Sequence, residues 1–292
     1  MAPNFLTGEE LDRAGLTALL DRAEELKRGR AERAGGDALA GRSVGLLFER
    51  PSTRTRISFE VGVFELGGHP VVLRGEELQL SRGESAADTG RVMSRFLSAI
   101  VIRSGSDEEV EALAEASEVP VVNGLTPSHH PCQALADMLT LRERFGELEG
   151  LRLAYVGDGN NCARSLAILG RTAGLEVVVA APEGYRLEDG LCEQAGEALE
   201  AAEGADALYT DVWVSMGDDD DAARRRADLG PFVLDSALLG IASPRAIALH
   251  CLPAHPGEEI TAEVLYGERS AVWDQAENRL HAQKALLELL VA

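Results

Sequence analysis

The stretch Val44-Gly45-Leu46-Leu47-Phe48-Glu49-Arg50-Pro51-Ser52-Thr53-Arg54-Thr55-Arg56 places an apolar run directly before a run of hydroxyl and guanidinium side chains. The apolar part predicts a buried strand, and Pro51 predicts a turn. Beyond the turn, apolar residues recur at helical spacing as far as position 64, which predicts a helix with Ser52 as its N-cap. Alternation of strands and helices of this kind is typical of α/β proteins.

The start of this helix is suited to a phosphate group. Unpaired backbone N–H groups and the positive end of the helix dipole both favour an anion there. The hydroxyls of Ser52 and Thr53 and the guanidinium groups of Arg54 and Arg56 would add hydrogen bonds to phosphate oxygens. Considered alone, the segment is equally consistent with an ordinary capped helix that carries arginines on its surface.

Two later segments place further polar groups at comparable positions. His129-His130-Pro131-Cys132-Gln133 precedes an apolar helical face, so His130 and Gln133 would lie at a second helix start as neutral hydrogen-bonding groups. His250-Cys251-Leu252-Pro253 follows the apolar run 246–249, and ligands of open α/β sheets bind at the carboxyl ends of strands. Considered alone, a cysteine such as Cys251 is more often structural than functional.

Composition narrows the class of protein. The chain has 292 residues, of which 45% are hydrophobic, and this suits one large or two ordinary domains with sizeable cores. A net charge of −21 argues against nucleic acid as a partner, because phosphates would be repelled. No apolar run approaches the roughly 20 residues of a membrane-spanning helix, and the N-terminus lacks a signal pattern. We therefore expect a cytoplasmic protein without a membrane partner.

The four cysteines are scattered along the chain at positions 132, 162, 192 and 251. They form no Cys-x-x-Cys pair and show no clustered ligand spacing, which is typical of reduced thiols. We expect neither a disulfide nor a zinc site, and hence no metal.

Alternating strand and helix patterns predict an α/β fold with two doubly wound parallel-sheet domains joined by bridging helices. In the first half, a helix over 9–28 precedes strands near 44–48, 71–73, 100–102 and 119–122. In the second half, strands are expected near 151–156, 176–180, 207–209, 232–234 and 246–249, and an amphipathic helix over 275–290 ends the chain.

The segment Gly157-Asp158-Gly159-Asn160-Asn161 invites a dinucleotide-binding interpretation, which the sequence disfavours. The third glycine of that motif would fall on Cys162, and the acidic residue expected for the ribose is not clearly placed. Acidic residues 218–221 followed by the arginines 224–226 predict a solvated helix whose charges complement its dipole. We assign no organic cofactor and give these arginines no chemical role.

Together these motifs resemble the aspartate/ornithine carbamoyltransferase family nearly end to end. The segments that carry the resemblance are 48–56, Gly83-Glu84-Ser85, Asp88-Thr89, Ile102-Arg103, His130-Pro131-Cys132-Gln133, 157–161, 210–217, His250-Cys251-Leu252-Pro253 and 274–279. The Ser-Met-Gly segment at 215–217 and the His-Cys-Leu-Pro segment are similar to the ornithine-specific branch and are lacking in the aspartate-specific branch.

The resemblance implies a carbamoyl phosphate-binding domain over 1–130, completed by the helix 275–292, and an ornithine-binding domain over 131–274, with the active site in the interdomain cleft. It implies transfer of the carbamoyl group to the δ-amine of L-ornithine, which gives L-citrulline and phosphate. This reaction belongs to arginine metabolism, and the sequence leaves open whether it serves arginine biosynthesis or arginine breakdown. No metal or cofactor is implied. A carbamoyltransferase for putrescine or an acylated ornithine, or a non-catalytic relative, remains the alternative.

The resemblance also implies roles for individual residues. The set expected to bind carbamoyl phosphate is Ser52, Thr53, Arg54, Thr55, Gln79, Arg103, His130, Gln133, Cys251, Leu252 and Arg279. Within this set, the residues expected to act on the reacting groups are Thr55, Arg103, His130 and Cys251. The set expected to bind ornithine is Asn160, Asn161, Asp211, Ser215 and Met216.

Two structural features follow from the same resemblance. The Leu252-Pro253 peptide bond is expected to be cis. The working unit is expected to be a homotrimer, or a multiple of trimers, in which Gln79 or its loop reaches the phosphate site of the neighbouring subunit. One departure lies at His255-Pro256-Gly257, where the family often has an arginine, and this puts the geometry of the loop in doubt.

Overall fold

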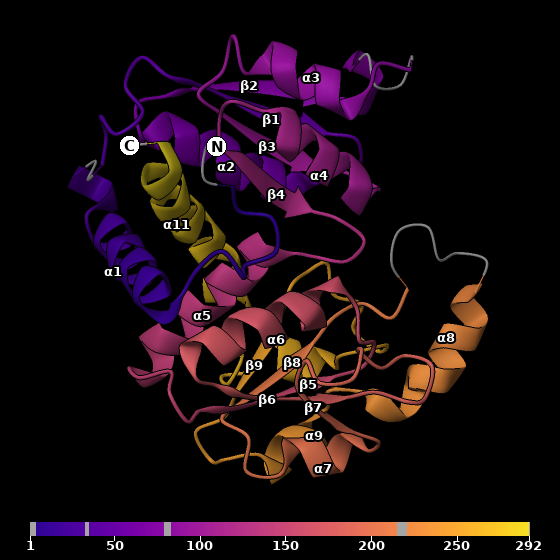
Figure 1. Ribbon diagram of the computed structural model, residues 1–292. Coiled ribbons are helices and arrows are strands. Elements are labelled where there is room, and N and C mark those ends of the chain that lie inside the picture. The colour runs from indigo at the N-terminus through magenta and orange to yellow at the C-terminus, as the bar shows by residue number, and fades with distance from the viewer. Residues whose placement is uncertain (1–3, 33–34, 79–82, 215–220, 292) are drawn as a thin grey trace. The chain divides into compact units, whose positions relative to one another are not determined.

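The computed structural model describes residues 4–32, 35–78, 83–214 and 221–291. The chain divides into two compact units (Figure 1). Unit 1 comprises Met1–Leu139 and Glu277–Ala292, and unit 2 comprises Thr140–Ala276. The chain therefore passes from one unit to the other within two helices, α5 (Pro131–Phe145) and α11 (Val272–Val291).

Unit 1 contains a parallel sheet of four strands in the order β2-β1-β3-β4. Its strands are β1 (Ser43–Phe48), β2 (His69–Arg74), β3 (Ala99–Arg103) and β4 (Val121–Leu125). Its own helices are α1 (Arg13–Arg28), α2 (Thr53–Glu65), α3 (Ala86–Met93) and α4 (Asp107–Ala116), with α3 packed beside α4 (Figure 1). The strand order reverses between β1 and β3, and ligands of such sheets bind outside the carboxyl ends of the strands at this point.

Unit 2 contains a parallel sheet of five strands in the order β7-β6-β5-β8-β9. Its strands are β5 (Arg152–Val156), β6 (Glu176–Ala180), β7 (Glu193–Ala195), β8 (Ala207–Thr210) and β9 (Ile247–His250). Its own helices are α6 (Asn161–Ala173), α7 (Ala198–Ala202), α8 (Ala222–Leu229), α9 (Ser236–Ile241) and α10 (Ala262–Leu265). Here the order reverses between β5 and β8. The expected pair of parallel α/β sheets is confirmed.

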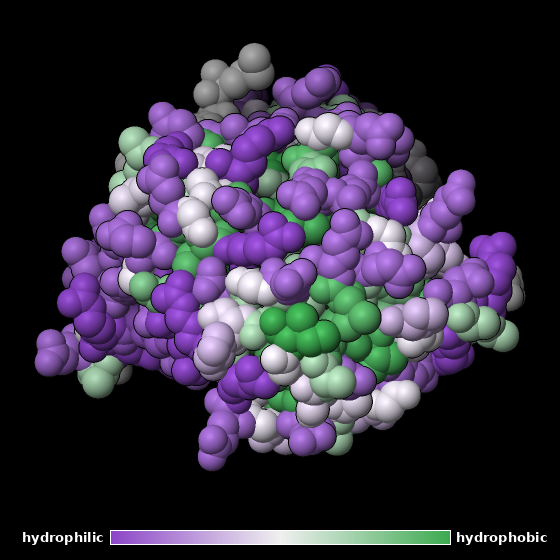
Figure 2. All heavy atoms as spheres, turned by 90° about the horizontal axis from the view of Figure 1, so that it is seen from below, coloured by the Kyte–Doolittle hydropathy of each residue, from purple (hydrophilic) through white to green (hydrophobic). Residues whose placement is uncertain are grey.

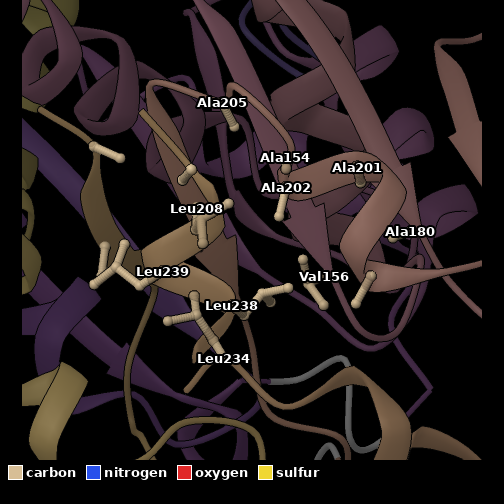
Figure 3. Packing of buried hydrophobic residues seen from close by; sticks show 14 of the residues in the cluster. Ala154, Val156, Ala180, Ala201, Ala202, Ala205, Leu208, Leu234, Leu238 and Leu239 are labelled. Carbon is tan, nitrogen blue, oxygen red and sulfur yellow. The ribbon is translucent and has the colours of Figure 1, made fainter. Parts of the chain in front are cut away.

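The core of unit 2 is built largely from small side chains. Alanines of α7 and leucines of α9 pack on one face of the sheet against residues such as Ala154, Val156 and Leu208 (Figure 3). Helix α6 covers the opposite face (Figure 1). Alanine lets a helix approach a sheet closely, so this core depends on small volume as much as on hydrophobicity.

The first helix differs from the sequence-based expectation at its start. It begins at Arg13 rather than Glu9, because the side chain of Asp12 accepts the backbone N–H of Gly15 and caps the helix there. Ahead of this cap, the Glu10 carboxylate accepts backbone N–H groups from Leu6, Thr7 and Gly8 and so holds a turn in place of a helical one.

The prediction of a strand over 232–234 was wrong. Residues Gly230–Phe232 form a 3-10 turn that contains Pro231, which has no N–H to donate to a sheet. Leu234 makes only an isolated bridge, to Ile260. The fifth strand of the sheet is instead β7, whose short polar sequence Glu-Gln-Ala offers no apolar signal.

Hydrophilic residues dominate the face of the molecule shown in Figure 2, with smaller groups of apolar residues among them. This agrees with a chain that carries 49 acidic against 28 basic residues. Within the ranges that the structure describes, no helix is both long and apolar enough to cross a membrane.

Candidate active site

In each unit, polar residues lie near the carboxyl ends of the two strands between which the strand order reverses. In unit 1, the turn after β1 leads into α2, and Arg103 ends β3, where it stands in register with Phe48 of β1. In unit 2, the loop 157–160 follows β5, and Asp211 follows β8. We call these two groups of residues the unit 1 site (Ser52, Arg54, Thr55, Arg103, His130, Gln133 and Arg279) and the unit 2 site (Asn160, Asn161, Asp211, Cys251 and Leu252).

Ser52 caps α2 as the sequence predicts. Its backbone is extended, with φ −155°, and its hydroxyl accepts the backbone N–H of Thr55 at 3.3 Å. The same oxygen also accepts from Nη1 of Arg103 at 3.4 Å. Because both bonds use the oxygen as an acceptor, the hydroxyl hydrogen of Ser52 is suited to donate to an anion at the helix start.

Arg279 of α11 connects α2 with α5 inside unit 1. Its Nη2 donates to Thr55 Oγ1 at 2.7 Å, and its Nη1 donates to Gln133 Oε1 at 2.9 Å. Gln133 in turn donates from Nε2 to Asp137 Oδ1 at 2.9 Å. Arg279, Thr55 and Gln133 are all at most 3% exposed. The Gln133 oxygen has a second lone pair, so it can accept one more hydrogen bond from a ligand.

His130 is a neutral imidazole in the middle of positive charge. It is buried just before α5, and a turn in which Thr126 and His129 exchange hydrogen bonds leads up to it. Burial is the main cause that lowers the pKa of His130 well below its usual value, and the charges of Arg279, Arg103 and Arg54 lower the pKa further. The expectation that this residue acts as a neutral donor is therefore physically consistent.

Two other residues proposed for the phosphate, Thr53 and Arg56, have exposed or partly exposed side chains on α2. Arg56 forms an ion pair with Glu60, one turn along α2, at 3.5 Å, with both side chains about two-fifths exposed. Thr53 is exposed on the first turn of α2. Gln79 lies outside the described residues.

In unit 2, the side chain of Asn160 forms hydrogen bonds within the protein. Its Oδ1 caps α6 by accepting the backbone N–H groups of Cys162 (2.9 Å) and Ala163 (3.2 Å), and it also accepts from the Tyr155 hydroxyl (3.1 Å). Its Nδ2 donates to Asp211 Oδ2 at 2.8 Å. The oxygen and one amide hydrogen of Asn160, one of the two asparagines expected to bind ornithine, are thus bonded within the protein.

Asp211 is a buried carboxylate surrounded by hydrogen-bond donors. It is 5% exposed, and its Oδ1 accepts from its neighbour's backbone, Val212 N, at 2.8 Å and from the Cys251 thiol at 2.6 Å. A buried carboxylate with this arrangement still favours a cation at its remaining lone pairs. An α-ammonium group is such a cation.

Cys251 is a protonated thiol. Its hydrogen bond with Cys162 is the largest cause that raises the pKa of the thiol well above its usual value, followed by burial and by the negative charge of Asp211. Because the thiolate is the nucleophilic form of cysteine, this environment disfavours a covalent role for Cys251.

Sequence spacing did not reveal that Cys162 lies beside Cys251. One ligand atom from each of Cys162, Asp211 and Cys251 lies within 4.8 Å of the others. Two thiols and a carboxylate at these distances are a set that can hold a metal ion. The strand order of the unit 2 sheet brings these three residues together although they are far apart in sequence.

The segment after β9 is held in an unusual conformation. The Leu252-Pro253 peptide bond is cis, as predicted, and Leu252 has a left-handed backbone with φ 60°. His250 accepts the backbone N–H of Leu252 at Nδ1 (2.9 Å), and its Nε2 lies 3.0 Å from Glu259 Oε1. The backbone N–H of His250 donates to Gln275 Oε1 at 2.9 Å. Sequence reasoning had not singled out Glu259, because it lies in a loop without a recognisable pattern.

The structure does not describe Ser215 and Met216, so their expected contact with a carboxylate lies outside the described residues.

Comparison with known proteins identifies the family. Residues 3–143 match the model for the carbamoyl-P binding domain of aspartate/ornithine carbamoyltransferases, and residues 149–290 match the model for the Asp/Orn binding domain. The chain belongs to the aspartate/ornithine carbamoyltransferase family. The two matches together cover nearly the whole chain.

Named members of the family are similar over their full length. The chain is 51% identical to the ornithine carbamoyltransferase of Acidothermus cellulolyticus, with 100% of this chain and 97% of that protein covered. It is 48% identical to the ornithine carbamoyltransferase of Methanoculleus marisnigri, with 100% and 98% covered. Among solved structures, the ornithine carbamoyltransferase from Pyrococcus furiosus has a TM-score of 0.95 at 42% identity, with 99% and 97% covered. The enzyme from Thermus thermophilus has a TM-score of 0.93 at 45% identity, with both chains fully covered.

Proposed function

We propose that the protein transfers the carbamoyl group of carbamoyl phosphate to the δ-amine of L-ornithine, which gives L-citrulline and phosphate. The observation that carries this proposal is the positive charge gathered around His130 in unit 1: Arg103 and Arg279 are buried, Arg54 is half-buried at the start of α2, and all three charges lower the pKa of the buried His130 just before α5. Positive charge concentrated at one place in a protein with a net charge of −21 favours an anionic ligand there, and carbamoyl phosphate is such a ligand. The full-length relatives named above favour ornithine over other acceptors.

Carbamoyl phosphate already carries a good leaving group, so the protein has to hold it, polarise its carbonyl and present an amine. Ser52, Thr53, Arg54 and Thr55 bind the phosphate at the N-terminus of α2. Thr55 also donates to the carbamoyl oxygen, where negative charge develops during attack, together with Arg103 and His130. One preorganised donor of this kind is typically worth about 3 kcal/mol of the barrier.

Gln133 recognises the carbamoyl nitrogen through the free lone pair of its Oε1, since Arg279 uses only one. The backbone carbonyl of Leu252 is a second acceptor for this nitrogen. Arg279 holds both Thr55 and Gln133 in place by donating to each of them.

The acceptor is held by its α-substituents, so that its δ-nitrogen is free. Asp211 pairs with the α-ammonium, and Asn161 donates to the α-carboxylate together with the backbone of Ser215 and Met216. A primary amine of this type has a pKa near 10.4 and is mostly protonated at neutral pH. The arginines of unit 1 disfavour another cation, and the neutral thiol of Cys251 contacts the amine without adding charge. The phosphate leaving group collects the proton.

Steady-state kinetics with a panel of amines tests the proposal. We expect kcat/KM for L-ornithine to exceed that for putrescine and for Nα-acetylornithine by at least a hundredfold. Putrescine lacks the α-carboxylate, and Nα-acetylornithine lacks the α-ammonium charge. Comparable turnover of putrescine would exclude this assignment of the acceptor.

A homotrimer, a cytoplasmic location and a role in arginine biosynthesis belong to the same proposal. The trimer contains shared sites, with Gln79 reaching the phosphate site of a neighbour in a heterologous ring contact. The reduced state of all four cysteines supports a cytoplasmic location. Assayed at a carbamoyl phosphate concentration at which Arg54→Ala and Gln79→Ala are each impaired, mixed subunits of the two variants are expected to regenerate some sites without either lesion. Recovery of activity after subunit exchange supports shared sites, and a fully active monomer under assay conditions excludes them.

A further inference from the structure

We propose that Arg225 of α8 is a positioning residue for the amino-acid acceptor, because it ties together the two loops that carry Asn161 and Asp211. The inference rests on the proposed function and deepens it. Sequence reasoning treated arginines 224–226 alike, as charges on a solvated helix. The structure separates Arg225 from its two neighbours.

Arg225 makes three contacts at once. Its guanidinium group forms an ion pair with Asp158, and the two side chains are only 15% and 14% exposed. Its Nε donates to the backbone carbonyl of Trp213 at 2.5 Å. Its Cζ lies 5.1 Å from the ring centroid of Tyr185, within the usual range of a cation–π contact.

These three partners belong to the segments that shape the unit 2 site. Asp158 lies in the loop after β5, shortly before Asn161, and Trp213 lies two residues after Asp211. The Trp213 indole also lies against the first loop, because a Cβ added at Gly157 would stand 3.5 Å from Nε1 of Trp213. Arg225 therefore fixes the distance between the two loops from outside the site.

Tyr185 holds the first loop from a third side. The backbone N–H of Gly159 donates to the Tyr185 carbonyl at 2.7 Å. A Cβ at Gly159 would stand only 2.6 Å from that carbonyl, so the approach requires glycine at this position. The ring of the same tyrosine is the surface on which Arg225 lies, so movement of Arg225 would be transmitted to the loop.

Arg225 also neutralises a charge that would disturb the site. Burial raises the pKa of Tyr155 well above its usual value, and the negative charges of Asp211 and Asp158 both raise it further. Both carboxylates therefore act on the same region. With Arg225 removed, Asp158 would lose the positive charge of this ion pair in the same region as Asp211, and this would favour misplaced binding of a cationic acceptor.

The neighbouring arginines supply matched controls on the same helix. Arg224 is 65% exposed and pairs with Asp221 one turn away, and Arg226 is 48% exposed and pairs with Glu258. Exposed pairs of this kind contribute little to stability. Substitution of Arg224 removes one positive charge from α8 without touching either loop.

The test compares the full-length wild type with Arg225→Ala, Arg225→Lys, Asp158→Asn and the control Arg224→Ala. Steady-state citrulline formation gives KM for ornithine and kcat, and calorimetric titration gives the affinity for carbamoyl phosphate. We expect Arg225→Ala to raise KM for ornithine at least tenfold, while carbamoyl phosphate affinity stays within twofold of wild type. Arg225→Lys recovers part of the loss because it keeps the ion pair, and Arg224→Ala matches the wild type.

A general loss of folding would reduce the affinity for both substrates, so the contrast between them separates positioning from stability. If KM for ornithine in a folded Arg225→Ala variant stays within twofold of wild type, or if Arg224→Ala raises it equally, the inference is overturned. A wild-type protein that makes no citrulline contradicts the proposed function itself, and that outcome is distinguished because it appears before any substitution.

Discussion

At the scale of single residues, Arg54 is proposed to bind carbamoyl phosphate and does not belong to the hydrophobic core of unit 1. It is half-buried at the first turn of α2 and contributes to the positive field around His130. We expect Arg54→Ala to weaken carbamoyl phosphate binding about 10- to 100-fold, since a hydrogen bond to a charged group contributes about 1.5–3 kcal/mol. Calorimetric titration measures this loss. A folded variant with unchanged affinity would remove Arg54 from the phosphate site.

His130 links the unit 1 site to the pH dependence of stability. The folded protein keeps its imidazole neutral because the pKa of His130 is lowered, whereas the unfolded chain takes up a proton below about pH 6.5. The contribution of His130 to the free energy of unfolding is therefore fully present above about pH 6.5 and is lost as the pH falls towards the folded pKa.

We expect His130→Asn to show a shallower fall in stability than the wild type between about pH 6.5 and pH 5. Urea unfolding at a series of pH values measures the difference. His281, whose pKa is also lowered, mainly by burial, contributes equally to both proteins and cancels in the comparison. Parallel curves for the two proteins would mean that His130 is not held neutral.

At the scale of elements, the small side chains of α7 make a sharp prediction. Ala202 is fully buried against the sheet, whereas Leu199 on the same helix is 58% exposed. Ala202→Leu overfills this layer and should cost about 1–3 kcal/mol, while Leu199→Ala should stay within about 0.5 kcal/mol of wild type. Chemical denaturation of the two variants measures the contrast. Equal stabilities would show that the layer is loosely packed.

Sequence patterns predicted the starts of α2 and α5 well, because the residues that fix a helix start lie within a few positions of it. Ser52 caps α2 and Pro131 begins α5 because hydroxyl caps and N-terminal prolines act on their own turn. Strand β7 escaped prediction because its edge position needs no apolar run, and the segment 232–234 was misread because burial without pairing looks like a strand in sequence.

Contacts within the sites were harder to predict because they depend on strand order. Cys162 follows β5 and meets Cys251 after β9, and Asp158 after β5 meets Arg225 on the helix that follows β8, so both contacts depend on the strand order β5-β8-β9. Its place at a helix start made His130 a candidate and the family resemblance made Asp211 one, but partners such as Asn160 and Cys251 come from segments far along the chain. The hydrogen bonds of Asn160 were also not predictable from local sequence: its side-chain amide caps α6 and donates to Asp211.

At the scale of the whole molecule, charge is the dominant feature. An excess of acidic residues gives a net charge of −21, so self-repulsion opposes the folded state. Raising NaCl from about 0.05 M to about 0.5 M shortens the screening length and should raise Tm, with about 2–4 °C expected per kcal/mol gained. Exposed pairs such as Arg95 with Glu118 lose little, because they contribute little at low salt. A Tm that falls with salt would contradict this view.

We propose that unit 1 binds carbamoyl phosphate and that unit 2 binds an amino acid by its α-substituents, so that only the δ-nitrogen attacks. The most direct measurement is NMR of the product formed from carbonyl-13C carbamoyl phosphate and L-ornithine labelled with 15N at the δ-position. We predict that the labelled carbon becomes bonded to the labelled nitrogen, with release of one phosphate per bond formed. A product carbamoylated at the α-nitrogen, or phosphate release without a new carbon–nitrogen bond, would contradict the account.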